Sequence, residues 1–253
     1  MKKLSVTIVT LDEERNIDRC LNSVQWADEI VIVDSGSTDR TLDICREYDC
    51  KIVQTDWLGF ARTKQLAVNA TSHDWVLSID SDEEVTPELQ KRISEIIKND
   101  QTQKGYRIHR RSYYLGKMLK HSGLTKDYPL RLFHRDFGQF NQKPVHEQVV
   151  VNGEVGQIEE ILLHYTVPTL ASHIRKIELF AELDALESQQ KGKKTRVTAA
   201  FARGLLKFMQ LYFFKLGFLD GRHGLIYAAN SAFAEYMKSL MLWERTTLPN
   251  KLY

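Results

Sequence analysis

The sequence predicts an α/β protein built around a Rossmann-like, mostly parallel sheet. In the first hundred residues, short β-rich runs alternate with helical patterns, and the links between them are short. The run at residues 29–33 is continuously apolar from Ile30 onward, as is usual for parallel strands that are covered on both faces. Two of the runs end at acids, Asp34 and Asp80. Because ligands of such sheets bind beyond the carboxyl ends of the strands, these acids are candidate site residues.

Local patterns assign the elements of this first half in turn. Thr10 to Glu13 has the spacing of a capping box, and an amphipathic helical pattern follows it. Thr86 and Pro87 form a good N-cap and first-turn pair for a helix that extends to about residue 98. The expected strands are residues 4–9, 29–33, 50–54 and 75–80, and further helices are expected at 41–48 and 61–70.

The pattern changes after residue 100. Residues 105–110 and 130–135 alternate like half-exposed strands. Residues 148–151, followed by Asn152-Gly153, predict a hairpin turn. From residue 170 the pattern is helical, with a polar break at 188–195. The sequence therefore predicts a second half rich in strands and then a helical C-terminal extension.

The composition excludes several classes of protein. A chain of 253 residues fits one large α/β domain or a domain with an extension, and a net charge of +2 gives no indication of nucleic-acid binding. Its three cysteines are unpatterned, which favours reduced thiols in a cytoplasmic protein. No run of 18 apolar residues predicts a membrane span. The glycine-rich phosphate loops of dehydrogenases and P-loop NTPases are missing.

The acids at the end of the strand at residues 75–80 predict a metal site. Asp80 and Asp82 are separated by one residue, so on extended backbone both side chains point to the same side. Two such carboxylates repel each other unless a cation lies between them or one takes up a proton. Carboxylates are preferred ligands of Mg²⁺ and Mn²⁺, and Mg²⁺ is usually held by one or two of them together with substrate phosphates. The alternative is an acidic loop that leads into the next helix.

Four short segments resemble, in their order and spacing, the signatures of family 2 glycosyltransferases, which have the GT-A fold. These segments are residues 10–17 (TLDEERNI), 33–39 (VDSGSTD), 59–67 (GFARTKQLA) and 80–82 (DSD). The sequence departs from the family pattern at Asp12, where Asn is frequent, and at Gln65, where Asn is usual. Ser35 replaces the second acid of the common Asp-Asp-Gly-Ser, which puts the contacts of that acid in doubt.

Three later segments are similar to a subgroup of the family, the lipopolysaccharide core β-1,4-glucosyltransferases that act on inner-core heptose. They are residues 131–133 (RLF), 145–147 (VHE) and 164–165 (HY). The resemblance covers most of the chain. It implies a GT-A catalytic domain at residues 1–168, with a nucleotide-sugar half (1–100) and an acceptor half (101–168), and a helical extension at 169–253.

The resemblance also implies a donor pocket at the strand ends. Thr10, Asp12 and Glu13 are expected to line the nucleoside pocket, although a capping box needs only the first and last of these. Asp34 is expected to meet uracil or ribose, or it is a turn residue at a strand end. Asp80 is expected to hold the ribose or the donor sugar.

Three basic residues are candidate partners of the donor. Arg62 and Lys64 suit the nucleotide by their charge, and the alternative for both is a solvated helix face. Arg131 either binds the diphosphate or pairs with an acid at a sheet edge.

For metal binding and catalysis, the resemblance points to four residues. Asp82 is expected to hold Mg²⁺ or Mn²⁺, and His164 is expected to complete the site, since imidazole is a reasonable Mn²⁺ ligand. A structural histidine after a strand is the alternative for His164. An inverting transferase needs a carboxylate that deprotonates the acceptor hydroxyl, and Glu147 is the first candidate for this base, with Asp127 as its rival.

The predicted function is an inverting glycosyltransferase that moves glucose from UDP-glucose to a lipopolysaccharide inner-core heptose. The alternatives are another nucleotide sugar or acceptor (a lipid phosphate, a polysaccharide or a protein) and a non-catalytic nucleotide-sugar-binding protein. The expected location is the cytoplasm, with contact to the inner face of the inner membrane. Basic residues of the extension, such as Arg196, Arg203 and Lys207, share one helix face and suit an anionic membrane surface, or this region only caps the catalytic domain.

Overall fold

The computed structural model describes residues 2–99, 102–125, 127–141 and 147–248. The chain divides into two compact units. The first comprises Met1–Arg111 and Lys126–His164, and the second comprises Ser112–Thr125 and Tyr165–Tyr253. The predicted domain limits, 1–168 and 169–253, stay a prediction.

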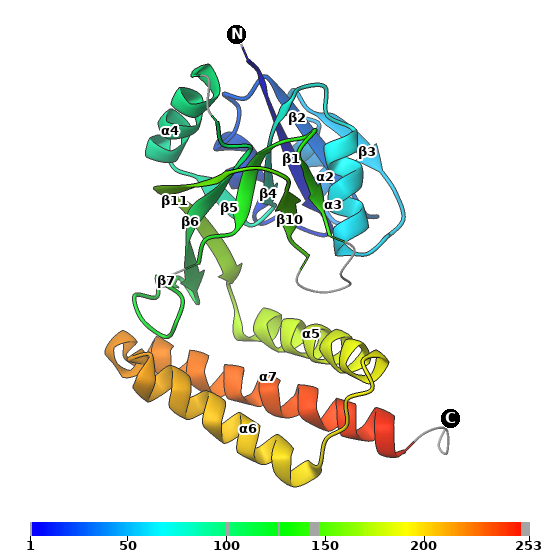
Figure 1. The fold of residues 1–253 in the computed structure, drawn as a ribbon, viewed down its shortest axis with the longest axis vertical. Helices are drawn as coiled ribbons and strands as arrows, with labels where there is room; N and C mark the ends of the chain where they lie inside the picture. Colours follow the sequence, from blue (N-terminus) through cyan, green and yellow to red (C-terminus); the bar gives the residue numbers. More distant parts are fainter. Residues whose placement is uncertain (1, 100–101, 126, 142–146, 249–253) are drawn as a thin grey trace. The chain divides into compact units, whose positions relative to one another are not determined.

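A parallel sheet forms the centre of the first unit (Figure 1). Its strands are β1 (Leu4–Thr10), β2 (Glu29–Asp34), β3 (Lys51–Gln54) and β4 (Trp75–Asp80), in the order β3-β2-β1-β4. All three strand pairs in this group are parallel. The predicted α/β fold class, with its Rossmann-like parallel sheet and its C-terminal helices, is confirmed.

Four further strands extend the sheet beyond β4. The order continues as β8 (Leu130–His134), β6 (Gly105–Tyr114), β11 (Val155–Val167) and β5 (Glu83–Val85). The pairs β4–β8, β6–β8 and β11–β5 are antiparallel. This arrangement brings β5, which directly follows the acidic end of β4, beside the end of β11 that carries His164.

Two apolar clusters cover the two faces of the sheet. Leu77 and Ile79 of β4 pack in the larger cluster, together with residues of α1 (Ile17–Asn22) and α4 (Pro87–Lys98). Val76 points to the other face and packs with α3 (Phe60–Asn69). A small antiparallel sheet of β9 (Gly138–Phe140) and β10 (Val149–Val151) lies in the same cluster. Side chains that alternate between two buried faces explain the continuous apolar runs of these strands.

Two local predictions about turns and caps are wrong. Thr10 belongs to β1 and pairs with Asp34, so the stretch from Thr10 to Glu13 is not a capping box, and α1 begins only at Ile17. Asn152-Gly153 does not join a hairpin of adjacent strands, because β10 pairs with β9 upstream instead of with β11. The predicted cap at Thr86 is confirmed, since its hydroxyl accepts a hydrogen bond from Leu89 N.

The second unit consists mainly of three helices, α5 (Leu170–Gln190), α6 (Val197–Met209) and α7 (Arg222–Thr247). Helix α7 lies between the other two and packs against both, as Figure 1 shows. A π turn at Gln210–Phe214 and a 3₁₀ turn at Gly217–Asp220 connect α6 to α7. Gly204 permits a close approach, because a Cβ atom there would lie 3.1 Å from the Ala232 carbonyl oxygen of α7. Among the described residues, no helix has the length and apolar character that crossing a membrane requires.

Candidate functional site

The carboxyl ends of β1, β2 and β4 meet at one edge of the parallel sheet. Thr10 lies opposite Asp34 in the β1–β2 register, and Val9 lies opposite Asp80 in the β1–β4 register. The side chains that the sequence singled out at three separate strand ends are therefore neighbours in the first unit. Binding at this edge is the usual arrangement in open parallel sheets.

Asp12 and Asp34 join the two loops that form this edge. One carboxylate oxygen of Asp34 accepts hydrogen bonds from Gly36 N and Ser37 N, both at 3.0 Å. Asp12 accepts a 2.7 Å bond from Thr38 N, and its own backbone N–H donates to the Ser37 hydroxyl at 2.9 Å. Asp12 has a positive φ of 53°, a conformation in which Asp and Asn are enriched among non-glycine residues. Both acids thus shape the loops whether or not they also touch a ligand.

Two buried hydroxyls point to a ligand pocket between these loops. Thr10 and Ser35 are 2% and 8% exposed, and their hydroxyl oxygens have no hydrogen-bond partner within the part of the chain that the structure describes. The two residues are adjacent, since Ser35 N donates to the Thr10 carbonyl at 3.1 Å. Unpaired buried polar atoms are rare and call for an explanation such as a missing ligand or water. The carboxylate of Glu13 accepts a hydrogen bond from the Asn16 amide at 2.7 Å.

A chain of ion pairs runs from α3 to β8 and Glu147 in the first unit. Lys64 Nζ is 2.7 Å from Asp80 Oδ1 and 2.7 Å from Glu147 Oε1. Arg131 of β8 contacts the other carboxylate oxygen of Asp80 and lies 2.6 Å from Glu83 Oε1. The structure thus brings together Lys64, Asp80, Arg131 and Glu147, which the sequence had proposed for one site.

Glu83 and Arg110 extend the same chain of ion pairs, and sequence reasoning missed both. Arg110 Nη1 is 2.9 Å from Glu83 Oε1, and its Nε is 2.8 Å from Asp127 Oδ2. The second Glu83 oxygen accepts from Asp80 N at 3.0 Å, so this fully buried carboxylate fixes two arginines and the end of β4. A signal for Arg110 existed: it shares a strand face with Ile108, which is a core residue. We find no signal that separates Glu83 from its neighbour Glu84.

Opposite charges favour the charged forms of Asp80, Lys64 and Arg131. Burial alone would raise the pKa of Asp80, but the charges of Arg131 and Lys64 outweigh it and hold that pKa well below its ordinary range. Burial lowers the pKa of Lys64, and Asp80 and Glu147 together more than reverse this effect. The pKa of Arg131 is likewise raised, because Asp80 and Glu83 outweigh its burial. These three groups therefore carry fixed charges at the edge of the sheet.

Asp82 and His164 lie beside this network and form a separate pair. His164 Nε2 is 3.3 Å from Asp82 Oδ1, and both side chains are largely buried. Among the described residues, no group of three or more His, Cys, Asp or Glu side chains is arranged to hold a metal ion. A carboxylate and an imidazole nevertheless fit Mn²⁺ as a partial ligand set, since diphosphate oxygens and water commonly supply the remaining ligands.

The structure separates the two basic residues that were predicted on α3. Lys64 is buried and faces the acids, whereas Arg62 is exposed. Residues two apart on a helix do not share a face, so only Lys64 belongs to the network. Of the subgroup segment at residues 145–147, Val145 and His146 lie outside the described residues, and Glu147 contacts Lys64.

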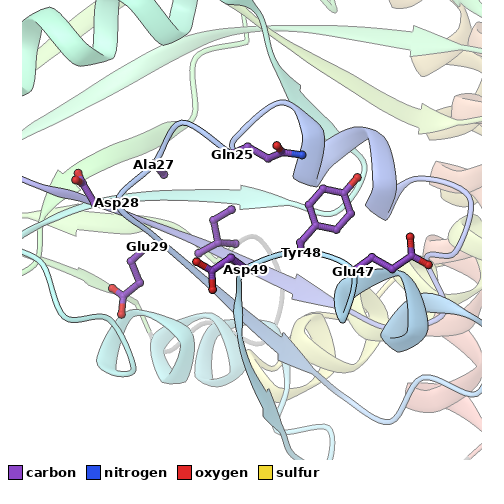
Figure 2. Close-up of a pocket in the computed structure, with 8 residues that line it drawn as sticks. Gln25, Ala27, Asp28, Glu29, Glu47, Tyr48 and Asp49 are labelled. Atoms are coloured by element: carbon purple, nitrogen blue, oxygen red, sulfur yellow. The ribbon is translucent and has the colours of Figure 1, made fainter.

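A cavity of about 410 Å³ lies elsewhere in the first unit and does not suit a nucleotide (Figure 2). Its lining includes Asp28 and Glu29 at the amino end of β2, whereas the site described above lies at the carboxyl ends. Glu47 and Asp49 add two more acids to the lining. Four carboxylates repel a diphosphate, so this cavity is not a donor site.

Comparison with known proteins shows which family the chain belongs to. The model of "Glycosyl transferase family 2" matches residues 5–156, which include the strand ends, the ion-pair network and Glu147. The chain is a family 2 glycosyltransferase. Its match also covers β1, β2 and β4, whose carboxyl ends carry Thr10, Asp34 and Asp80.

Relatives of this glycosyltransferase match it over almost its whole length. A glycosyltransferase of Rickettsia typhi, RT0209, is 30% identical over 96% of this chain and 88% of its own. The lipopolysaccharide core biosynthesis glycosyltransferase LpsC of Rhizobium meliloti is 29% identical over 97% of this chain and 93% of its own. Among solved structures, Staphylococcus aureus TarS 1-349 in complex with UDP-GlcNAc has a TM-score of 0.53 at 16% identity, covering 100% of this chain and 93% of its own. That structural likeness supports the fold.

Proposed function

We propose that this glycosyltransferase transfers glucose from UDP-glucose to an inner-core heptose of lipopolysaccharide, with inversion at the anomeric carbon. The name of LpsC supports the class of acceptor, and the UDP-GlcNAc complex of TarS supports a UDP-sugar donor. The observation that carries the proposal is the buried ion-pair network at the carboxyl edge of the sheet, with the Asp82–His164 pair beside it.

The net negative charge of the site indicates that a divalent cation binds together with the donor. The site contains five carboxylates and three cations, which leaves two negative charges before the donor brings its diphosphate. Such a site repels a diphosphate unless a metal ion binds with it. Bound Mg²⁺ or Mn²⁺ would stabilise the negative charge that develops on the leaving diphosphate. The carboxylates belong to Asp80, Asp82, Glu83, Asp127 and Glu147, and the cations to Lys64, Arg110 and Arg131.

The chain's own residues divide the remaining work. Thr10 and Ser35 offer unpaired buried hydroxyls to the nucleoside, and we assign Asp80 to the ribose or the sugar. Glu147 takes the proton of the acceptor hydroxyl. At the same time the hydroxyl oxygen of the acceptor bonds to the anomeric carbon, and the bond between that carbon and the diphosphate breaks. Lys64 positions Glu147 and Asp80 at once, because a single ammonium contacts both. Asp127 remains the rival base, and Arg110 holds it.

The proposed acceptor also indicates where the enzyme works. An inner core that is still being built is attached to lipid A, so we propose that the enzyme acts as a peripheral protein at the cytoplasmic face of the inner membrane.

Two measurements test the proposal. Calorimetry with UDP, with and without Mn²⁺, should show binding that the metal strengthens and that Asp82→Ala weakens. Glu84→Gln is the control, because this neighbouring acid is paired with Arg19, at 3.6 Å, and not with His164. A screen of radiolabelled UDP-sugars against truncated core acceptors should show transfer of glucose. If UDP does not bind in the presence of either Mg²⁺ or Mn²⁺, the chain is not a UDP-sugar transferase of this type.

A further inference from the structure

Helix α6 and the π turn after it carry a row of large apolar side chains that are exposed. Phe201 and Leu205 are 61% and 65% exposed, and Phe214 is 78% exposed. Ala200 and Gly204 of the same helix are buried, and Gly204 faces α7. The ring of Phe201 also contacts Tyr236 of α7, with 4.8 Å between the ring centroids, and the side chain is still mostly exposed. We call this row the α6 apolar face; it consists of Val197, Phe201, Leu205, Leu206, Met209, Phe213 and Phe214.

The segment that carries the α6 apolar face has positive charges and no negative ones. From Lys191 to Leu219 the sequence has seven Lys or Arg residues and no acid. Asp220, the next acid, is buried and accepts hydrogen bonds from the backbone N–H groups of Lys120 and His121, both at 3.0 Å. The charged side chains of this segment are therefore all basic, and its exposed surface combines them with large apolar side chains.

Helix α5 shows that exposed apolar residues alone do not define such a surface. Leu179 and Phe180 are 47% and 39% exposed, which is comparable to part of the α6 apolar face. Helix α5 contains four acids and two basic residues, and three of the acids, Glu182, Asp184 and Glu187, form ion pairs with Arg245, Lys238 and Lys191. This part of α5 therefore has no excess of positive charge, and an anionic surface would attract α6 more strongly than α5.

We propose that the α6 apolar face binds the surface of an anionic lipid bilayer, with α6 lying in the plane of the headgroups. Phenylalanine and leucine side chains enter the boundary between headgroups and acyl chains, and the basic side chains contact anionic headgroups. A second copy of the chain is a poorer occupant. A symmetric dimer through this face would bring the same positive charges together, since the same patch occurs on both subunits. This proposal rests on the proposed function and adds to it a specific contact with the membrane.

Vesicle flotation with the full chain tests this inference without any donor or acceptor. Binding should be strong to vesicles of phosphatidylcholine with phosphatidylglycerol, weak to phosphatidylcholine alone, and reduced by salt. Each basic residue near an anionic surface strengthens binding about fivefold. Replacing Arg203 and Lys207 together by glutamine should therefore weaken binding by ~25-fold.

A matched pair of double variants locates the surface. Phe201→Ser with Leu205→Ser should abolish flotation, whereas Leu179→Ser with Phe180→Ser on α5 should leave it unchanged. Equal loss in both pairs, or no flotation of a full chain that still binds UDP, overturns the proposal. A dimer that the α6 variants dissociate, without flotation, assigns the face to a second copy and also overturns it. Flotation by a chain that does not bind UDP supports this surface and contradicts the proposed function alone.

Discussion

In the first unit, charged side chains are buried and paired with opposite charges, whereas in the helical unit large apolar side chains lie exposed. Lys64, Asp80 and Glu83 each contact oppositely charged partners within 3 Å. Phe201, Leu205 and Phe214 of the second unit are each more than half exposed. In the first unit these charged groups already have partners within the chain. The exposed apolar side chains of the second unit contribute stabilising free energy only when another surface covers them.

The contrast indicates which unit tolerates change. Removing one partner of a buried ion pair leaves an uncompensated charge, which costs stability as well as function. Removing an exposed apolar side chain has little effect on folding, because its surface was never taken from water. Chemistry and stability are therefore coupled in the first unit, and attachment and stability are separable in the second.

The largest expected effect is on turnover, at Glu147. Glu147→Gln removes the proposed base and should lower kcat by about 10²- to 10⁴-fold, the usual contribution of a positioned proton acceptor. The affinity for UDP, measured by calorimetry, should stay within about threefold, because the side chain is assigned to the acceptor. Full turnover in Glu147→Gln, together with an inactive Asp127→Asn, would move the role to Asp127.

The next effect is on stability, at Glu83. Glu83→Gln leaves Arg110 and Arg131 without the carboxylate that they share, and the cost should be about 3–5 kcal/mol in urea unfolding. Glu84→Gln is the control, because Glu84 is only partly buried and its ion pair with Arg19 is 3.6 Å long. We expect a change within ~0.5 kcal/mol for this neighbour. Equal effects in the two variants would remove the distinction between paired burial and ordinary surface charge.

The sequence predicted the strand ends well, because their information is local. Alternation between β-rich runs and helical patterns predicts the strands β1 to β4 along the chain, and it places Asp34 and Asp80 at one edge of the sheet. The capping-box prediction at Thr10 is wrong because pairing between strands took precedence over a local helix signal: Thr10 continues β1 opposite Asp34.

The partners of the buried charges were beyond sequence reasoning, because they are distant in the chain. Glu83 bonds Arg110 across 27 residues and Arg131 across 48. Charge type and spacing do not reveal which of many lysines and arginines meet in space. The choice between Arg62 and Lys64 shows the same limit: helical periodicity says that they face different ways, and only packing shows that Lys64 faces inward.

A buried polar cluster in the helical unit gives a smaller, pH-dependent effect. His173 Nδ1 lies 2.9 Å from the Tyr114 hydroxyl and 3.2 Å from the Asn230 amide nitrogen. Burial, with the nearby charge of Lys176, lowers the pKa of His173 below its usual 6.5. The unfolded chain thus binds more protons below about pH 6.5, so this unit should lose stability as the pH falls, by at most about 1.4 kcal/mol per pH unit.

Hydrogen exchange of α5 and α7 amides between pH 7.5 and pH 5.5 measures this effect in the helical unit alone. His173→Gln keeps a polar side chain without the titration, so its exchange should depend less on pH after correction for the intrinsic rate. Identical pH profiles in the two proteins would show that His173 does not contribute, and the polar cluster would then be no exception to the apolar character of this unit.

The smallest effect compares one helix cap from each unit. Thr169 caps α5 through a 3.1 Å bond from Ser172 N, and Thr169→Ala should cost about 0.5–1 kcal/mol. Thr86 caps α4 and also donates to the Ile161 carbonyl at 2.8 Å, so Thr86→Ala leaves a partly buried acceptor unpaired as well and should cost about 1–2 kcal/mol. Hydrogen exchange in the first turn of each helix measures both. A larger cost at Thr169 than at Thr86 would contradict the view that the first unit is the one in which each polar contact is tied to others.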